Sequence, residues 1–243
     1  MTQMLHSTCQ AACLYNSPGR VHSSTTSIYS QPQLHLDQKR LYSMGAFTAS
    51  AQAPLHPVNP PIGIFPYLYA KEPTALNIKE KISWSGDDFA VKDLAGWVVV
   101  RCEGQAFSYR DRKIIRDSSG KFLFCLRNKI MTFFKTIIAE DEHGQELFRV
   151  QKHFAFGAKA IATFHDAATN VPMALSLRGD FWGGSADISV VNGPVIAQIY
   201  RDVLNAREIF AGQQTYYVAV APGVDLALMA AMCICLNEMK NER

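Results

Sequence analysis

The chain has 243 residues, of which 48% are hydrophobic and 19% are charged, and its formal net charge is +3. These values are typical of a globular domain with a sizeable core. They lack the concentrated basic charge that binding to duplex nucleic acid requires, so no nucleic-acid partner is expected. The longest uninterrupted apolar run, 226–236, is shorter than the roughly 20 residues of a membrane-spanning helix, so no transmembrane segment is predicted.

Residues 1–50 are predicted to form a disordered tail, because they are rich in Ser, Thr and Gln and poor in large aliphatic residues. They contain no apolar segment of the secretory kind. Arg20 is the only arginine before Asp37, which argues against a mitochondrial transit peptide. We therefore expect an intracellular, cytoplasmic protein, with peripheral membrane association left open.

Six cysteines, mostly within apolar runs, are expected to be free thiols of a reducing compartment: Cys9, Cys13, Cys102, Cys125, Cys233 and Cys235. Cys9 and Cys13 have a tolerable ligand spacing, but no further His or Cys pair nearby completes four ligands. No metal site and no cofactor are predicted.

Residues 51–75 form a proline-rich lead-in that is expected to be extended, with Ile62, Ile64 and Phe65 packed against the domain. From Leu76 onward, short runs rich in Val, Ile, Phe and Tyr alternate with turn signals, as in an all-β domain. The clearest predicted strands are 97–100, 113–116, 122–126, 146–150, 160–164, 173–177, 188–191, 195–199 and 216–220. Arg178-Gly179-Asp180 is predicted to be a turn.

Three turn signals recur at a fixed interval. Asp93, Asp117 and Asp141 follow one another by 24 residues, and each is followed three residues later by Gly. An Asp that opens a turn accepts hydrogen bonds from its own backbone, and Gly closes the turn at positive φ. A step of this length corresponds to two strands and two connections, which predicts an antiparallel meander of ten to twelve strands.

The chain ends in a predicted helix at about 224–240, which is apolar on every side between Leu226 and Leu236. A helix of this kind must be enclosed by protein or lipid, and it is too short to span a bilayer easily. A closed sheet of about twelve strands leaves a lumen that such a helix can fill. We predict a mainly β fold over 76–243, a closed antiparallel barrel around a central C-terminal helix.

Three stretches, 113–127, 179–199 and 217–238, resemble the LURP-one-related family. This family belongs to the tubby C-terminal-like superfamily, which also includes phospholipid scramblases. The resemblance covers about residues 60–240 and implies a tubby-like barrel of twelve strands around a central helix. The tubby branch is associated with phosphoinositide binding through basic residues on the barrel wall. The cysteine-rich run and the acidic calcium segment of the scramblase branch are not found here.

The densest basic cluster lies on one predicted hairpin and comprises Arg110, Arg112, Lys113, Arg116, Arg127 and Lys129. A basic face of this kind is suited to a phosphorylated headgroup or an anionic membrane. The alternative is a solvated strand face whose charge is balanced by Asp111 and Asp117. A looser basic stretch, 149–159, surrounds Phe154 and Phe156, which indicates either lipid or nucleic-acid contact or core aromatics beside a turn.

The chain contains no Gly-x-Ser-x-Gly, P-loop, dinucleotide fingerprint or His-Glu-x-x-His motif. The first hypothesis is therefore a non-enzymatic, monomeric, tubby-like barrel that binds phospholipid or phosphoinositide headgroups peripherally or acts as an adaptor. The alternative is a protein-interaction or structural scaffold without a lipid ligand. A third hypothesis, an enzyme of unknown class, requires an external cleft in which His and carboxylate side chains converge.

Overall fold

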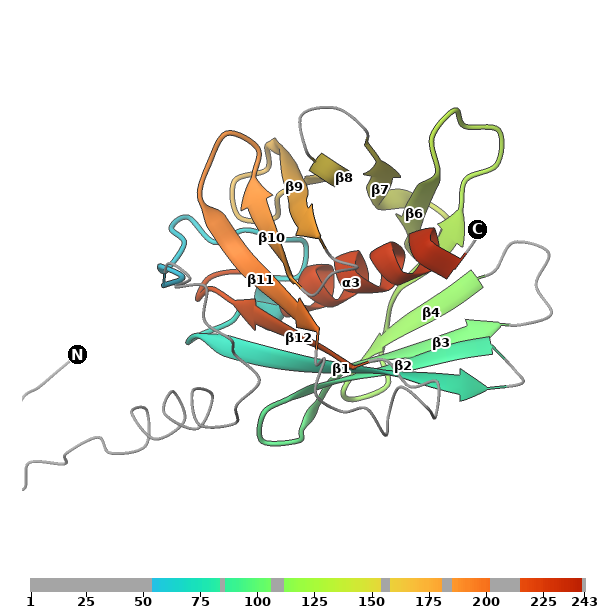
Figure 1. The fold of residues 1–243 in the computed structure, drawn as a ribbon, viewed down its shortest axis with the longest axis horizontal. Helices are drawn as coiled ribbons and strands as arrows, with labels where there is room; N and C mark the ends of the chain where they lie inside the picture. Colours follow the sequence, from blue (N-terminus) through green and yellow to red (C-terminus); the bar gives the residue numbers. More distant parts are fainter. Residues whose placement is uncertain are drawn as a thin grey trace, which may run out of the picture. The chain divides into compact units, whose positions relative to one another are not determined.

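The computed structural model describes residues 54–83, 86–105, 112–153, 158–180, 185–201 and 215–241. In this part of the chain, twelve antiparallel strands close into a barrel, because β1 pairs with β12 and every other strand pairs with its neighbours in sequence. A 3-10 turn, η1, precedes the barrel, and the helix α3 follows it (Figure 1). The predicted fold, a closed barrel around one C-terminal helix, is confirmed.

The elements and their bounds are η1 (Pro66–Leu68), β1 (Thr74–Ser83), β2 (Gly86–Asp93), β3 (Val98–Gln105), β4 (Arg112–Asp117), β5 (Phe122–Asn128), β6 (Thr136–Glu140), β7 (Glu146–Lys152), β8 (Ala158–His165), β9 (Pro172–Asp180), β10 (Ser185–Val190), β11 (Val195–Arg201), β12 (Thr215–Val220) and α3 (Leu226–Asn241). Nine of the strands coincide with predicted runs, and β1, β2 and β6 were not singled out. In β1 the buried Leu76 and Ile78 alternate with other residues, so the strand has no continuous apolar run.

Helix α3 runs through the middle of the ring of strands (Figure 1). Every residue from Ala227 to Leu236 is buried, on all sides of the helix. The sequence predicts a helix that is apolar on all sides, and this helix fills the lumen of the barrel. The strand side chains alone would leave a void there.

The regularly spaced turns all lie at one end of the barrel, because a hairpin returns to the same end after every two strands. Gly96, Gly120 and Gly144 have φ values of 89°, 89° and 76°, which is the conformation that these turns require. Asp93 Oδ1 accepts the Trp97 backbone N–H at 2.8 Å, and Asp117 and Asp141 accept backbone N–H groups in the same way. The predicted turn chemistry is confirmed. Helix α3 begins at this end.

The lead-in closes the end of the barrel at which α3 begins, which we call the sealed end. The backbone N–H of Ile62 donates to the carbonyl of Gly223 at 2.9 Å, and that of Ala70 donates to the carbonyl of Val224 at 2.9 Å. The Phe65 ring stacks on Phe124 inside the barrel, with 5.9 Å between ring centroids. The expected packing of this segment against the domain is confirmed.

One local prediction is wrong. Arg178, Gly179 and Asp180 form the end of β9 and not a turn. Gly179 has a φ of 113°, and a Cβ atom there would lie 2.9 Å from the Cα atom of Ala186 in β10. A glycine at this position therefore allows β9 and β10 to approach each other closely. The sequence alone does not distinguish such a glycine from one in a turn.

Cys102, Cys125, Cys233 and Cys235 are free thiols, and burial raises the pKa values of Cys233 and Cys235. Cys9, Cys13 and the predicted disordered tail lie outside the described residues. In the part of the chain that the structure describes, no helix has both the length and the apolar character needed to cross a membrane.

Candidate functional site

At the end opposite the sealed end, where α3 finishes, one group of neighbouring strand ends and their loop is rich in basic residues. We call this the helix-end rim. It comprises residues 112–113 of β4, 126–136 of β5, β6 and their connecting loop, 151–153 at the end of β7, and 235–239 of α3. Its backbone is continuous, because Lys129 N–H donates to the Thr136 carbonyl at 2.8 Å and Lys152 N–H donates to the Lys135 carbonyl at 2.9 Å.

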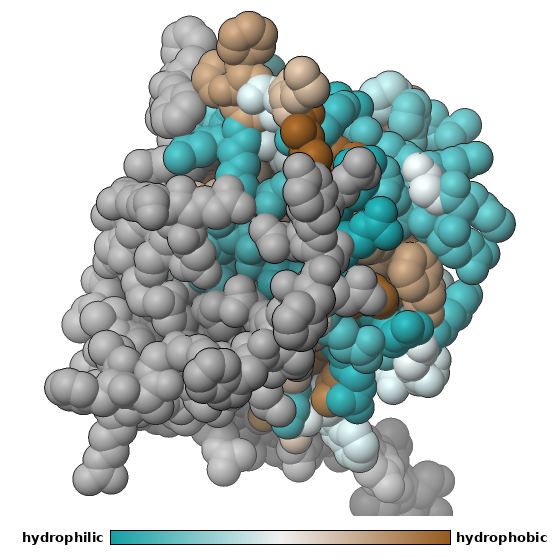
Figure 2. Space-filling model, turned by 90° about the vertical axis from the view of Figure 1, so that its right-hand side faces the viewer, coloured by the Kyte–Doolittle hydropathy of each residue, from teal (hydrophilic) through white to brown (hydrophobic). Residues whose placement is uncertain are grey.

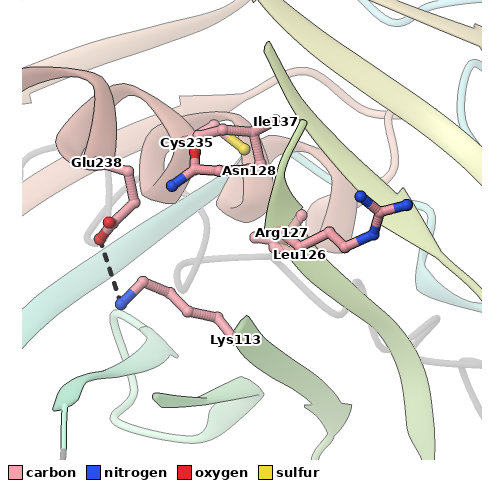
Figure 3. Close-up of a pocket in the computed structure, with 7 residues that line it drawn as sticks. All are labelled: Lys113, Leu126, Arg127, Asn128, Ile137, Cys235 and Glu238. Atoms are coloured by element: carbon pink, nitrogen blue, oxygen red, sulfur yellow. Dashed lines mark ion pairs between the residues drawn. The ribbon is translucent and has the colours of Figure 1, made fainter. Parts of the chain in front are cut away.

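A small recess, with room for about 10 Å³, opens between the helix and the strands at this rim (Figure 3). It is lined by Lys113, Leu126, Arg127, Asn128, Ile137, Cys235 and Glu238. Lys113 is only 6% exposed, and its Nζ lies 3.2 Å from the carboxylate of Glu238. An ion pair in such a poorly solvated place costs desolvation energy, but it fixes the end of α3 against β4.

A second lysine holds the same helix turn. The Nζ atom of Lys135, in the β5–β6 loop, donates to the carbonyl oxygen of Glu238 at 2.9 Å. The last carbonyl groups of a helix lack partners within the helix and carry partial negative charge, which a cation complements. The β5–β6 loop is thereby tied to the end of α3.

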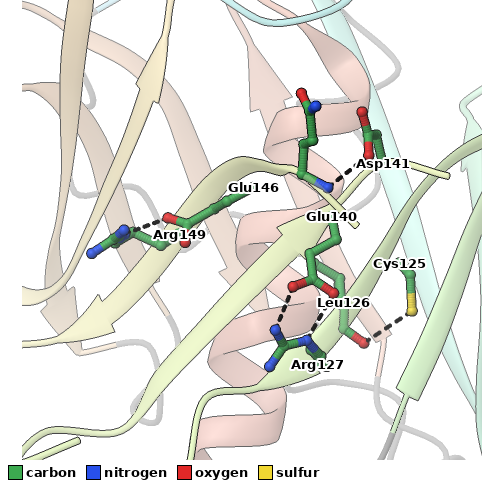
Figure 4. Close-up of polar contacts among 8 residues, drawn as sticks. Cys125, Leu126, Arg127, Glu140, Asp141, Glu146 and Arg149 are labelled. Atoms are coloured by element: carbon green, nitrogen blue, oxygen red, sulfur yellow. Dashed lines mark hydrogen bonds and ion pairs between the residues drawn. The ribbon is translucent and has the colours of Figure 1, made fainter. Parts of the chain in front are cut away.

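The outer wall next to the recess carries paired charges (Figure 4). Arg127 on β5 forms an ion pair with Glu140 on β6, and its Nε donates to a Glu140 carboxylate oxygen at 2.8 Å. This hydrogen bonding raises the pKa of Arg127. Toward the sealed end of β4, Arg116 lies 3.4 Å from Glu103 in a more exposed ion pair. These arginines are therefore largely neutralised in place.

The five predicted lipid-binding residues that the structure describes do not form one continuous basic face. Successive residues of a strand point to opposite sides, so Arg112 is exposed while Lys113 turns inward to the recess. Figure 3 shows Lys113 directed toward Glu238 and the Arg127 guanidinium directed away from it. Arg116 belongs to the opposite end of β4, next to the Gly120 turn, where it donates to the Gly120 carbonyl.

Four of the predicted residues lie at the helix-end rim, Arg112, Lys113, Arg127 and Lys129, although Arg127 pairs with Glu140 on the outer wall. Burial raises the pKa of Cys125, and the charge of Arg112 opposes this shift, so Arg112 lies within electrostatic reach of the β5 wall. Arg110 and the aromatic pair Phe154 and Phe156 lie outside the described residues. The sequence interpretation overlooked Lys135 and the apolar residues after Lys129, although a run of apolar residues inside a connection was a visible signal.

A separate polar cluster at the sealed end centres on the fully buried Asp225, which caps α3. Its Oδ1 accepts the N–H groups of Ala227 and Leu228, and its Oδ2 accepts those of Ile64 and Phe65, at 2.8 to 3.1 Å. Burial raises the pKa of Asp225 to about 6, against the opposing effect of the four N–H bonds. This carboxylate joins the lead-in to the helix and has no role at the rim.

Tyr69 and Asp166 border the same cluster. Burial, with the nearby carboxylates of Asp166 and Asp225, raises the pKa of Tyr69 to about 12. Asp166 is buried, and its Oδ1 accepts the Gly63 N–H at 2.8 Å. Within the described ranges, no three His, Cys, Asp or Glu side chains gather in a way that could hold a metal ion.

Comparison with known proteins agrees with this architecture. The sequence model of the LURP-one-related family matches residues 74–237, from β1 into the last turns of α3. Two relatives from Arabidopsis thaliana are Protein LURP-one-related 12, 22% identical over 182 residues, and Protein LURP-one-related 14, 24% identical over 175 residues. The alignments cover 72% of this chain and 82% of the first relative, and 70% of this chain and 86% of the second.

An X-ray structure of another Arabidopsis thaliana protein superposes with a TM-score of 0.52 at 18% sequence identity. The match covers 72% of this chain and 96% of that protein, and it supports the fold alone. The family match spans more than half of the chain and includes all twelve strands. The chain therefore belongs to the LURP-one-related family.

Proposed function

We propose that this barrel is a non-enzymatic module that binds anionic phospholipid membranes peripherally through the helix-end rim. The observation that supports this function is the charge of the rim. Two described rim cations are paired with acids, Arg127 with Glu140 and Lys113 with Glu238. The described rim residues contain four further cations and no further acid: Arg112, Lys129, Lys135 and Lys152. A basic residue close to an anionic membrane surface contributes about 1 kcal/mol to binding.

The size of the recess bears on selectivity. The recess has room for only about 10 Å³, roughly one water molecule, which is far below the roughly 300–1,000 Å³ of typical small-ligand pockets, and Glu238 at its wall repels phosphate. The proposed binding is therefore a charge attraction spread over the rim, without a deep pocket for one headgroup. Polyanionic phosphoinositides are expected to bind more strongly than phosphatidylserine because they carry more charge.

The test is co-sedimentation of the full chain with vesicles of phosphatidylcholine alone, with added phosphatidylserine, or with added phosphoinositide. Binding is expected only to the anionic vesicles, and raising the ionic strength from about 0.1 M to about 0.5 M is expected to weaken it. The variant Arg112→Gln/Lys129→Gln removes two exposed rim charges and is expected to weaken binding several-fold.

The control is the single variant Arg149→Gln, which removes an exposed charge that is paired with Glu146 on the outer wall (Figure 4). This variant is expected to bind vesicles as the native protein does. Equal binding to neutral and anionic vesicles would contradict the proposed function, and so would an equal effect of the rim and wall variants.

A second candidate function, a protein-interaction module, is favoured by a different observation at the sealed end. Trp97 and Leu94, in the β2–β3 turn, are exposed, and tryptophan is enriched among the residues that dominate binding energy in protein interfaces. If the native protein ignores all vesicles, Trp97→Ala in a co-purification experiment is the next test. Loss of a co-purified protein in this variant would support the scaffold function.

A further inference from the structure

The loop that joins β5 to β6 carries a compact group of exposed apolar side chains, which we call the apolar tip. Phe134 (46%) and Ile130 (54%) are about half exposed, and Met131 and Phe133 are fully exposed. Within the described residues, the remaining exposed large apolar side chains lie in the lead-in or in turns at the sealed end: Tyr67, Leu94, Trp97, Val171 and Val191. The apolar tip is therefore a feature of the helix-end rim.

The figures show the same placement. The loop projects beside β6 at the upper right of Figure 1. Figure 2 faces that side of the molecule: apolar side chains gather at the top of the view, and the coloured surface on the right is mostly hydrophilic. The tip is thus a convex projection. It cannot enclose a small ligand, but it can penetrate the surface layer of a lipid bilayer.

Hydrogen bonds give the loop a defined backbone. The Thr132 hydroxyl donates to the carbonyl of Phe134 at 2.7 Å, and the Thr136 hydroxyl donates to the same carbonyl at 2.9 Å. Met131 has a φ of 62°, a conformation that is uncommon for residues other than glycine. The loop therefore holds its apolar side chains outward instead of folding them onto the barrel wall.

Positive charge flanks the apolar tip on both sides. Lys129 precedes it and Lys135 follows it, and Arg112 lies on the neighbouring strand end. Proteins that bind at a membrane interface place apolar side chains at the headgroup and acyl boundary, and place Lys and Arg at the level of the phosphates. We propose that the β5–β6 loop inserts the apolar tip into the interfacial layer of an anionic phospholipid bilayer.

A protein partner fits these observations less well than a bilayer. A stable protein interface needs about 800 Å² from each partner, and Lys is depleted from such interfaces. The tip offers four side chains on a narrow projection flanked by lysines, with nothing comparable beside them on the described rim. This inference rests on the proposed function, because the rim charges bring the tip to the membrane, and it adds the mode of attachment.

The first experiment compares two double variants of the full chain on phosphatidylcholine/phosphatidylserine vesicles. Met131→Ser/Phe133→Ser makes the tip polar, and Leu94→Ser/Trp97→Ser makes the matched change in an exposed turn at the sealed end. The tip variant is expected to lower the vesicle partition coefficient at least about tenfold, because burial of two large apolar side chains is lost. The control is expected to bind as the native protein does, and unfolding curves check that both variants fold.

The second experiment reports insertion directly. A Phe133→Trp variant is expected to shift its fluorescence to the blue on these vesicles, and brominated lipids are expected to quench it beyond the quenching of the native protein. Native-like binding by the tip variant, with no added quenching of the introduced tryptophan, would overturn the inference and leave the charge-based function standing. If the native protein does not bind anionic vesicles at all, both proposals fail.

Discussion

Asp225 is predicted to make a pH-dependent contribution to stability, because its buried carboxylate holds the lead-in and the start of α3 together. The change Asp225→Asn keeps the size of the side chain and retains one oxygen for the N–H groups of Ala227 and Leu228. It places an amide NH₂ group opposite the N–H groups of Ile64 and Phe65, which now donate to Oδ2. Two buried donors then lose their acceptor, at about 1–3 kcal/mol each.

The loss of stability caused by Asp225→Asn depends on pH, because Asp225 can be ionised and asparagine cannot. The pKa of Asp225 is about 6 in the folded protein and 3.8 in the reference state, so the folded protein binds the proton more tightly. The contribution of Asp225 to stability is therefore full below about pH 3.8 and is lost as pH rises through about 6. The loss amounts to about 3 kcal/mol, at about 1.4 kcal/mol for each pH unit between the two values.

The asparagine variant lacks this titration. The difference in the free energy of unfolding between the native protein and Asp225→Asn is therefore expected to be about 2.4 kcal/mol larger near pH 4 than near pH 7. Urea unfolding followed by tryptophan fluorescence measures both values, and the other carboxylates cancel in the difference. The control is Asp141→Asn, because Asp141 also accepts backbone N–H groups, from His143 and Gln145, but in an exposed turn. A difference that stays constant or shrinks on acidification would refute the reasoning.

Three further perturbations test other contacts. Gly63→Ala is expected to destabilise the fold by at least about 3 kcal/mol in urea unfolding, because a Cβ there would lie 2.1 Å from Asp225 Cβ at a φ of 151°. Lys113→Met is expected to cost about 2–3 kcal/mol, because Glu238 is left as a poorly solvated charge. A chain that ends at residue 225 is expected to be insoluble or unfolded. The six large apolar side chains between Leu226 and Leu236 contribute about 9–18 kcal/mol as an upper bound, against a usual net stability of about 5–15 kcal/mol.

Controls separate these effects from general damage. Gly96→Ala changes a glycine with positive φ and open space around it, so its cost is expected to be about 1 kcal/mol. Adding Glu238→Gln to Lys113→Met is expected to recover part of the lost stability, because no unpaired charge remains. A double variant less stable than the single one would show that the pair is not the cause. A soluble chain ending at residue 225 that melts cooperatively would contradict the role of α3 as the core.

The sequence by itself determined the architecture of this protein, because local periodicity and turn chemistry carry that information. The Asp and Gly of each regular turn form hydrogen bonds within a few residues of chain, so their spacing predicts hairpins. The apolar circumference of α3 requires enclosure, and a barrel of about twelve strands supplies it.

Only the tertiary structure decided which charges are available at the surface. Strand register turns Lys113 toward Glu238, which lies far away in the sequence, while its neighbour Arg112 faces solvent. The same register places Glu140 beside Arg127 and neutralises it on the wall. A basic cluster in sequence is therefore divided among the interior, the wall and the rim, because side-chain alternation and partners from distant strands act only once the sheet has closed.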